Sequence, residues 1–407
     1  MIPLEEAREF VIGRCPVLPG VDTSYLDTVG RVLAADVVAR EDVPPYANTA
    51  MDGFAVRSAD VVVTPVSLAV VGTIAAGDDS ALRCEPGTAI RIMTGAVIPD
   101  GADAIVMLED TESPGPDTVV VKRTVAAGTS VRPVGDDVRC GDVVFRAGTV
   151  VGPAGAGVLA SINARVVLAH RRARVALVST GDELVVDGSP LRRGQIRESN
   201  LTSLHNVLLR EGCEVINLGI VADDESVLEG VLRDAARNCD AIVTSGGVSV
   251  GDFDVVKAVL SRIATMRWMQ LAIKPAKPFA FGELAPDDGS SRTVPVFGLP
   301  GNPVSSLISF ELLARPALRK MMGHRHDVVR PTIRAVADTA LRRKPDGKVH
   351  YMRVFAEPGT DGRIHVRDAG PQGSHQLAAT ALANALAVVP DGTGIDAGAE
   401  IDVLWPF

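Results

Sequence analysis

The chain of 407 residues carries a formal net charge of −9, and 46% of its residues are hydrophobic but only 4% are aromatic. A chain of this length exceeds one ordinary hydrophobic core, so two to four domains are expected. The acidic balance argues against a nucleic-acid-binding protein, which needs a basic face. No stretch of about 18 apolar residues predicts a membrane span.

The cysteine pattern and the N-terminal residues indicate the compartment. The five cysteines form no C-x-x-C pair, which favours free thiols in a reducing cytosol over a zinc ribbon or a redox pair. Charged side chains interrupt the N-terminal apolar residues, so this stretch does not resemble a signal peptide. We therefore expect a cytoplasmic protein that binds neither nucleic acid nor membrane.

The first part of the chain predicts a scaffold and a β-rich domain. Residues 3–12 have helical spacing, and short β-type runs separated by glycine and proline follow over 37–144. Gly152-Pro153 then opens a predicted helix that runs to Ile162, because proline is tolerated in a first helical turn. We expect a scaffold or linker domain over 1–36 and 138–172, and a small β-rich domain over 37–137.

The middle part, residues 173–323, alternates strand and helix signals. Such alternation predicts a doubly wound α/β domain, with a mostly parallel sheet covered on both faces. The expected strands are 175–179, 215–219, 241–244, 268–273, 279–282 and 294–297, and the expected helices are 199–210, 226–237, 253–263 and 304–322, the last with a kink or break at Pro316.

The last part, residues 324–407, returns to β signals and predicts a compact C-terminal β domain. Strands are expected at 332–337, 350–356, 363–366 and 401–405. Ser374 is expected to cap a helix that runs to about Leu386.

Polar, turn-rich segments follow the strands of the predicted α/β domain. In open α/β sheets, ligands bind beyond the carboxyl ends of the strands. These segments are therefore expected at one edge of the sheet. They contain Thr180-Gly-Asp-Glu183, Asp223-Asp224, Ser245-Gly246-Gly247 with Ser249, Asp252 and Asp254, Lys274-Pro-Ala-Lys-Pro278, and Leu299-Pro-Gly-Asn-Pro303.

The residue types at this edge point to phosphate chemistry with a divalent cation. Carboxylates are hard oxygen ligands that suit Mg²⁺, and lysines are point charges that suit phosphate or another oxyanion. Glycine turns that open helices can present backbone N–H groups to an anion. Together these groups are what metal-assisted cleavage at a phosphate requires.

Each feature also has a simpler interpretation. Asp223-Asp224 could only cap a helix, and Asp182-Glu183 could be a solvated turn. Gly246-Gly247 could serve tight packing, and single lysines are usually surface charges. The chain has no P-loop motif and no G-x-G-x-x-G after a strand, which argues against a P-loop NTPase and a dinucleotide oxidoreductase. The coincidence of all these features at one edge favours a functional site.

A second group of motifs lies in the β-rich part. Asn48-Thr-Ala-Met-Asp-Gly-Phe-Ala55 places Asp52-Gly53 in a turn, which we interpret from the sequence as a hairpin. Ile92-Met-Thr-Gly95 is typical of a strand followed by a turn.

Taken together, six motifs resemble those of the molybdopterin molybdenumtransferases, the MoeA and gephyrin E-domain family, and the match extends over essentially the whole chain. The motifs are Met51-Asp-Gly-Phe-Ala55, Ile92-Met-Thr-Gly-Ala96, Ser179-Thr-Gly-Asp-Glu183, Ser245-Gly-Gly-Val-Ser-Val-Gly-Asp252, Ile273-Lys-Pro-Ala-Lys-Pro-Phe279 and Gly298-Leu-Pro-Gly-Asn-Pro303.

The resemblance implies an enzyme of molybdenum cofactor synthesis. Family members take adenylylated molybdopterin, insert molybdate at its dithiolene sulfurs and release AMP, with a divalent cation, usually Mg²⁺. The implied fold is an elongated multidomain subunit with a molybdopterin-binding doubly wound α/β domain, a small β-rich domain and a C-terminal β-barrel-like domain. The subunit is expected to form a homodimer, in which the β-rich domain of the partner completes the cleft.

The resemblance leaves some partners and alternatives open. Molybdopterin adenylyltransferase and molybdoenzyme apoproteins are candidate partners, and the sequence does not separate molybdenum from tungsten. The alternatives are a non-catalytic scaffold of the same fold and an adenylyltransferase that makes the adenylylated pterin.

Site residues carried over by motif fall into two groups. The implied catalytic positions are Asp52, Thr94, Glu183, Asp223 and Asp254, of which the last three also match metal positions. The implied substrate positions are Ser245, Gly246, Gly247, Ser249, Lys274, Lys277, Pro300, Asn302, Pro303, Ser305, Arg353 and Ser374.

Two departures from the family pattern stand out. Phe54 occupies a position where tyrosine is common, and Ala276 replaces a common glycine.

Overall fold

The computed structural model describes residues 1–248, 255–326 and 328–405. The chain divides into two compact units. The large unit comprises Met1–Val21, Gly30–Ala34 and His170–Phe407, and the small unit comprises Asp22–Val29 and Ala35–Ala169. No helix among the described residues is long and apolar enough to cross a membrane.

A six-stranded sheet in the order β7-β4-β6-β5-β9-β8 forms the core of the small unit. Side chains of β4 alternate between the two faces: Phe54 and Val56 join one buried cluster, and Ala55 joins the other. The strands are β4 (Gly53–Val56), β5 (Val66–Ile74), β6 (Thr88–Ile92), β7 (Ala104–Met107), β8 (Thr111–Gly115) and β9 (Thr118–Val121).

Shorter elements make up the rest of the small unit. Helix α2 (Pro153–Ser161) begins with proline in its first turn, as the sequence predicts. Short two-stranded sheets pair β2 (Val37–Val38) with β11 (Val143–Phe145), β3 (Asn48–Thr49) with β10 (Val131–Arg132), and β1 (Gly20–Ser24) with β12 (Val166–His170).

The large unit contains a six-stranded sheet in the order β16-β13-β17-β21-β20-β18. Neighbours from β16 to β21 pair in parallel, and β20 is antiparallel to both β21 and β18. All strands except β20 therefore run in one direction. The strands are β13 (Arg174–Thr180), β16 (Glu214–Val221), β17 (Ala241–Ser245), β18 (Thr265–Gln270), β20 (Pro278–Leu284) and β21 (Val294–Leu299).

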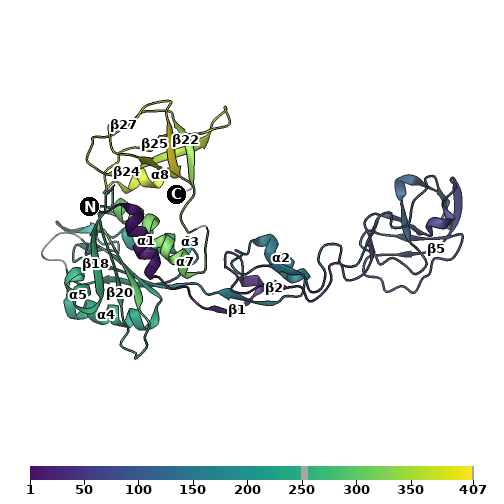
Figure 1. Cartoon of the computed structure of the whole chain (residues 1–407), viewed down its shortest axis with the longest axis horizontal. Helices are drawn as coiled ribbons and strands as arrows, with labels where there is room; N and C mark the ends of the chain where they lie inside the picture. The colour runs from purple at the N-terminus through teal and green to yellow at the C-terminus, as the bar shows by residue number, and fades with distance from the viewer. Residues whose placement is uncertain (249–254, 327, 406–407) are drawn as a thin grey trace. The chain divides into compact units, whose positions relative to one another are not determined.

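Helices cover both faces of this sheet (Figure 1). Along β13, Val175 and Leu177 belong to one hydrophobic cluster, and Ala176 and Val178 belong to the other. The first cluster includes side chains of α1 (Leu4–Arg14), α3 (Asn200–Arg210) and α6 (Pro303–Ser309), and the second includes those of α4 (Glu225–Asn238) and α5 (Val255–Ile263). The predicted doubly wound α/β architecture is confirmed.

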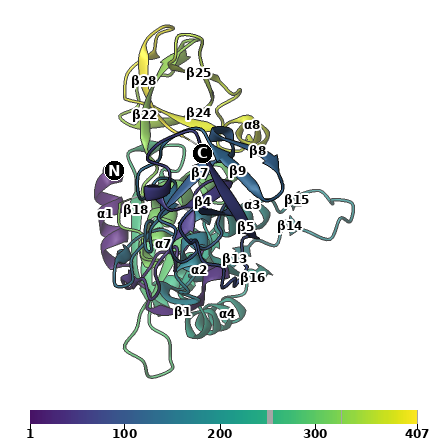
Figure 2. The same cartoon turned by 90° about the vertical axis from the view of Figure 1, so that its right-hand side faces the viewer.

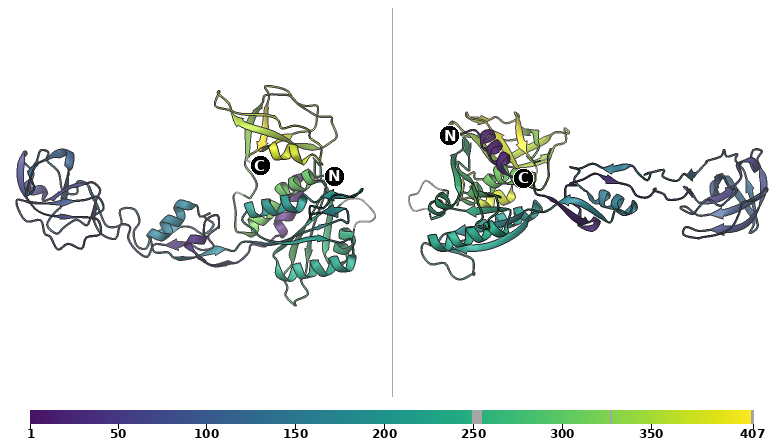
Figure 3. Two further views of the ribbon diagram at one scale, coloured as in Figure 1. Left: turned by 180° about the vertical axis from the view of Figure 1, so that it is seen from behind. Right: turned by 60° about the horizontal axis from the view of Figure 1, so that its bottom comes forward.

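The helix predicted over 304–322 is interrupted next to Pro316, where the sequence predicts a kink or break. Helix α6 passes into a π-helical turn, η4 (Phe310–Ala314), and α7 (Arg315–Met321) follows. Pro316 has no N–H for the carbonyl of Leu312, and that carbonyl instead accepts a bond from Arg8 Nε at 3.1 Å. Arg8 lies on α1, which is beside α7 in both views of Figure 3.

The predicted strand over 268–273 also needs correction. Strand β18 ends at Gln270, and Ile273–Lys274 form a separate strand, β19, that pairs with β24 of the C-terminal part. The chain leaves the sheet because the Leu271 N–H bonds to Lys277 O at 2.7 Å and the Ala272 N–H bonds to Ile2 O at 2.8 Å.

The C-terminal part of the large unit is a closed five-stranded barrel, in the order β24-β25-β22-β28-β26, closed by pairing of β24 with β26. Figure 2 shows β22, β24, β25 and β28 of this barrel. This confirms the predicted barrel-like domain. The strands are β22 (Thr332–Ala337), β24 (Val349–Pro358), β25 (Ile364–Asp368), β26 (Ala385–Val389) and β28 (Glu400–Leu404), and β23 (Leu341–Arg342) pairs with β27 (Gly394–Ile395) outside the barrel.

The helix predicted to begin at Ser374 is shorter than expected. Helix α8 covers Leu377–Leu382 and its N-cap is Gln376. It ends because the side chain of Asn384 bonds to both backbone groups of Ala356, at 2.7 and 2.8 Å, which fixes the start of β26.

Candidate functional site

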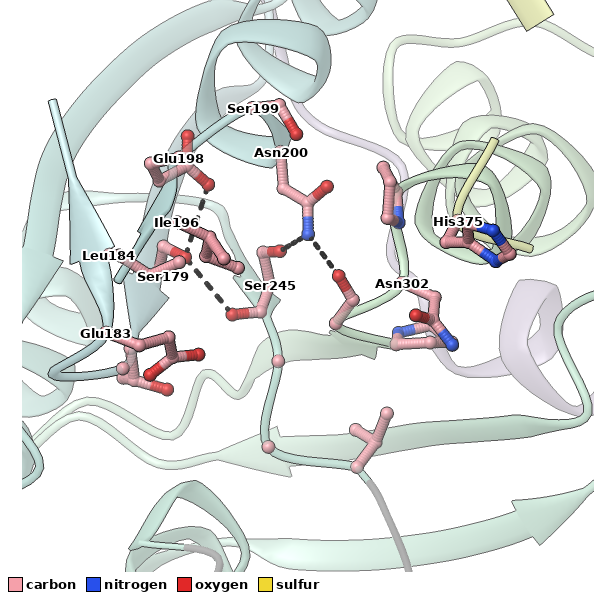
Figure 4. A pocket seen from close by; sticks show the side chains of 18 of the residues that line it. Ser179, Glu183, Leu184, Ile196, Glu198, Ser199, Asn200, Ser245, Asn302 and His375 are labelled. Carbon is pink, nitrogen blue, oxygen red and sulfur yellow. Dashed lines mark hydrogen bonds between the residues drawn. The ribbon is translucent and has the colours of Figure 1, made fainter. Parts of the chain in front are cut away.

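A cleft of about 820 Å³ lies at the carboxyl edge of the α/β sheet. Its walls come from the segments after β13, β16, β17 and β21, as the sequence predicts for this edge. Figure 4 shows Glu183 on one side of the cleft and Asn302 and His375 on the other. Eight predicted site residues line it: Glu183, Asp223, Ser245, Gly246, Gly247, Pro300, Asn302 and Pro303.

Asn200 joins the loops at the floor of the cleft. Its Nδ2 donates to Ser245 Oγ at 2.8 Å and to Gly301 O at 2.7 Å, so it connects the ends of β17 and β21 (Figure 4). Asn200 is only 9% exposed. The sequence prediction did not include Asn200, although it lies at the start of a predicted helix on the same edge of the sheet.

A buried carboxylate supports the same floor. Glu198 accepts the N–H of Leu201 with both side-chain oxygens at 2.9 Å, which anchors the first turn of α3. Ser179 Oγ donates to Ser245 O at 3.4 Å. These bonds keep the ends of β13 and β17 and the start of α3 together.

The neighbouring carboxylates Asp223 and Asp224, which the sequence left as either helix caps or site residues, have different roles in the structure. Asp224 caps α4, because its Oδ1 accepts the N–H of Ser226 at 2.8 Å and of Val227 at 3.0 Å. These bonds lower the pKa of Asp224. Asp223 instead lines the cleft, and its N–H bonds to Asp182 Oδ1 at 3.4 Å.

The carboxylate donors of the cleft suit a divalent cation. Glu183 and Asp223 offer hard oxygen ligands, and Mg²⁺ commonly uses one or two carboxylates together with water and substrate phosphates. No group of three or more His, Cys, Asp or Glu residues in the described part of the chain could hold a metal by itself. The predicted positions Ser249, Asp252 and Asp254 lie outside the described residues.

The glycine turn after β17 has a mixed role. Gly247 has a φ of +80°, and a Cβ there would lie 2.2 Å from Cβ of Val256, so close packing on α5 requires glycine. Gly246 donates its N–H to Leu299 O at 3.0 Å, which extends the sheet. That N–H is therefore committed to the sheet and not offered to an anion.

A second cavity of about 720 Å³ adjoins the cleft and is strongly basic. We call it the basic cavity. It shares Pro278 and Asn302 with the cleft. Lys274, Lys277, Ser305 and Ser374, all predicted site residues, line it, and β23, the start of β24 and the segment between them add Arg342, Arg343, Lys344, Lys348 and His350 as well as Asp346.

The charges in the basic cavity are coupled. Burial and the nearby positive charges of Arg343 and Lys274 lower the pKa of His350, against the effect of its bond to Asp346. The pKa of Asp346 is lowered to about 2, because the bonds from His350 and Lys348 outweigh the effect of its burial. His350 Nε2 lies 3.2 Å from both carboxylate oxygens of Asp346.

Arg353 is completely buried and is not among the described residues that line either cavity. Its guanidinium donates to Pro371 O at 2.6 Å and to Gly373 O at 3.3 Å. Burial lowers the pKa of Arg353. In this structure it acts as a support behind the segment that contains Ser374.

The two implied catalytic residues of the small unit are bonded to each other. Asp52 Oδ1 accepts the backbone N–H of Thr94 at 2.7 Å and its hydroxyl at 2.8 Å. These bonds lower the pKa of Asp52, so the carboxylate is ionised at neutral pH. Both side chains are exposed.

The hairpin interpretation of Asp52-Gly53 is wrong. Asp52 directly precedes β4, which pairs with β6 and β7, whereas β3 belongs to a different sheet. A Cβ on Gly53 would lie 2.1 Å from Val106 O, so the close approach of β4 and β7 requires glycine here.

Fold and site together define a class: a multidomain protein with an α/β domain, in which a cleft that contains carboxylates adjoins a basic cavity. Family comparisons specify it further. The chain matches the models of the MoeA N-terminal region (domain I and II) over residues 2–163, the probable molybdopterin binding domain over 176–320, and the MoeA C-terminal region (domain IV) over 334–405.

Whole-chain relatives agree with these matches. The chain is 35% identical to the molybdopterin molybdenumtransferase of Haemophilus influenzae over 410 residues, which covers 100% of this chain and 99% of the relative. It is 38% identical to molybdopterin molybdenumtransferase 2 of Mycobacterium tuberculosis over 385 residues, covering 92% of each chain. The crystal structure of the molybdopterin biosynthesis MoeA protein from Pyrococcus horikoshii superimposes with a TM-score of 0.80 at 27% identity and covers 99% of both chains. The chain belongs to the molybdopterin molybdenumtransferase family and is a transferase.

Proposed function

We propose that the protein inserts molybdate into adenylylated molybdopterin and releases AMP, which completes synthesis of the molybdenum cofactor. The observation that carries the proposal is the pair of adjoining cavities: a cleft with carboxylates, and a basic cavity with Lys274 and Lys277. We place the pyrophosphate of the adenylylated pterin in the cleft, and the negatively charged molybdate in the basic cavity beside the two lysines. The named relatives extend over the whole chain, so the adenylyltransferase alternative is not favoured.

A magnesium ion belongs to the proposal. Glu183 and Asp223 would hold it in the cleft, and Asp254 is the third candidate ligand. Bound there, it would neutralise charge on the pyrophosphate oxygens.

The side chains of the large unit provide the binding. Asn200 keeps Ser245 and the Gly301 carbonyl in fixed positions beneath the substrate. Lys274 and Lys277 neutralise the oxyanion, and Ser305 and Ser374 offer hydroxyl groups to it. The same lysines stabilise negative charge as the phosphate linkage breaks.

The proposal includes a homodimer in the cytoplasm. Asp52 and Thr94 form one exposed, preorganised pair, and the family resemblance implies that this pair serves the cleft of a partner copy. An ionised carboxylate held by two bonds suits such a role, because it needs no rearrangement on binding.

Turnover by the purified protein tests the proposed function. Incubation with adenylylated molybdopterin, molybdate and Mg²⁺ should release AMP and produce cofactor that activates a molybdoenzyme apoprotein. EDTA should stop the reaction and excess Mg²⁺ should restore it. Lys274→Ala should abolish most of the activity, whereas Lys122→Ala, which changes an exposed lysine of the small unit, should not. No AMP and no active cofactor from the wild-type protein would reject the proposal.

A further inference from the structure

Residues 371–376, which we call the dividing loop, form part of the wall of both cavities. Gln372, Gly373 and Ser374 line the basic cavity, and the next residue, His375, lines the cleft. The dividing loop thus presents the Ser374 hydroxyl to the basic cavity and the His375 imidazole to the cleft. His375 lies beside Asn302 in Figure 4, and Asn302 lines both cavities.

The dividing loop is held from the barrel side. Arg353 donates to the carbonyls of Pro371 and Gly373. The side chain of Gln372 bonds to both backbone groups of Arg353, at 2.9 Å each. The buried guanidinium of Arg353 and the side-chain amide of Gln372 therefore fix the dividing loop to β24.

The loop is also held from the side of the α/β domain and from within. Val304 at the start of α6 donates its N–H to Ser374 O at 3.1 Å, and Leu377 donates its N–H to His375 O at 3.1 Å. The backbone of His375 therefore has a fixed position relative to both cavities, while its imidazole is exposed to the cleft.

His375 differs chemically from the charged residues of the cleft. Those are Glu183, Glu198, Asp223 and Arg197 in the described part of its wall. Histidine is the side chain that both gives and accepts a proton near neutral pH, whereas guanidinium does not give up its proton. His375 is thus the described cleft residue best suited to proton transfer.

We propose that His375 is the acid–base residue for molybdenum insertion; this rests on the proposed function. Formation of two Mo–S bonds from a dithiol and molybdate breaks two S–H bonds and one Mo–O bond. The oxygen leaves as water with the two thiol protons, and molybdenum remains in oxidation state +6. The reacting groups meet where the two cavities adjoin, beside Asn302, and there His375 accepts a proton from a dithiolene sulfur and gives it to the departing oxygen.

The kinetics of His375→Gln, with molybdate varied, test this role. The expected result is a fall of about 10²-fold or more in kcat for cofactor formation, with KM for molybdate within about twofold of wild type. The pH profile of kcat should differ between His375→Gln and the wild type, because the variant has no ionisable side chain at this position. Added imidazole should restore part of the rate of His375→Ala, which a merely structural role would not allow. His326→Gln is the matched control, because His326 is exposed and is not among the residues that line the two cavities.

Three results would count against the assignment. A His375→Gln protein with wild-type kcat and pH profile overturns it, and so does a raised KM with unchanged kcat, which would indicate binding. A wild-type protein that makes no cofactor rejects the proposed function itself, and with it this role. Thermal melting of each variant separates loss of folding from loss of proton transfer, and imidazole rescue remains decisive if one variant is less stable.

Discussion

Ala276 has a backbone conformation that suits glycine. Its φ is +73° and its side chain is buried, between the two lysines of the basic cavity. A left-handed conformation destabilises a residue with a Cβ by about 1–2 kcal/mol. Glycine avoids this strain, but it loses more conformational entropy on folding, which offsets part of the gain. Ala276→Gly should therefore raise the free energy of unfolding by about 0.5–1 kcal/mol, measured by urea titration. An unchanged or lower stability would contradict this account of the strain.

Asn200 is the residue whose change should affect the cleft floor most directly. In Asn200→Asp, an oxygen replaces the Nδ2 that donates to Ser245 and Gly301, so the carboxylate faces the Gly301 carbonyl without a proton. We expect a loss of about 1–3 kcal/mol in unfolding free energy and a lower kcat/KM for the pterin substrate.

Asn206→Asp provides the control for this prediction, because Asn206 is exposed on the same helix and bonds only locally, to Thr202 O. If Asn200→Asp and Asn206→Asp behave alike, Asn200 does not organise the cleft.

At the scale of elements, two ionisable groups that contact each other have shifted pKa values: His350 at the start of β24 and Asp346 in the segment before it. Because the pKa of folded His350 is below its ordinary 6.5, the unfolded chain takes up its proton first as the pH falls, and the folded state loses stability below about pH 6.5. The groups that face His350 are Asp346, Arg343 and Lys274. Asp346, with a folded pKa of about 2, keeps its stabilising effect above its ordinary 3.8 and loses it as the pH falls toward 2.

Urea unfolding at pH 7 and pH 5 of the wild type and His350→Gln tests this prediction. The wild type should lose more stability than the variant over this range, and the Asp346 contribution should change only below about pH 4. Equal losses in both proteins would show that His350 is not held neutral.

The elements that the sequence predicts well are those fixed by local pattern. The buried runs of β13 and β17 and the amphipathic helices α3 and α4 carry their own periodicity, so their existence and type follow from the chain itself. The errors come from contacts distant in sequence. Arg8 supports the interruption near Pro316, and Ile2 bonds to the segment between β18 and β19. No local pattern contains such pairs.

At the scale of the whole molecule, the same limit applies to the site. The cleft was predictable because parallel strands place their following loops at one edge. In the basic cavity, the sequence predicted Lys274 and Lys277 from their place after a strand, and Ser305 and Ser374 through the family resemblance. The other wall of this cavity comes from the C-terminal part of the large unit, with Lys344, Lys348 and His350 more than 60 residues further along the chain.

The proposed homodimer predicts that mixed dimers of two inactive variants regain activity. Asp52→Ala and Lys274→Ala should each inactivate their own homodimers. In mixed dimers, a cleft shared between subunits leaves one site with both residues intact, so about a quarter to a half of wild-type activity should return. Light scattering first establishes that the protein is a dimer. Mixed dimers as inactive as the parents would show that each subunit works alone.

The central claim is that the carboxyl-edge cleft binds the adenylylated pterin while the adjoining basic cavity binds molybdate. Anomalous diffraction at the molybdenum edge, from crystals soaked with both substrates, tests it most directly. The account predicts a molybdenum peak beside Lys274, Lys277 and Ser374, with the adenylate in the cleft above Ser245. A peak elsewhere in crystals of active protein, with the basic cavity empty, would contradict it.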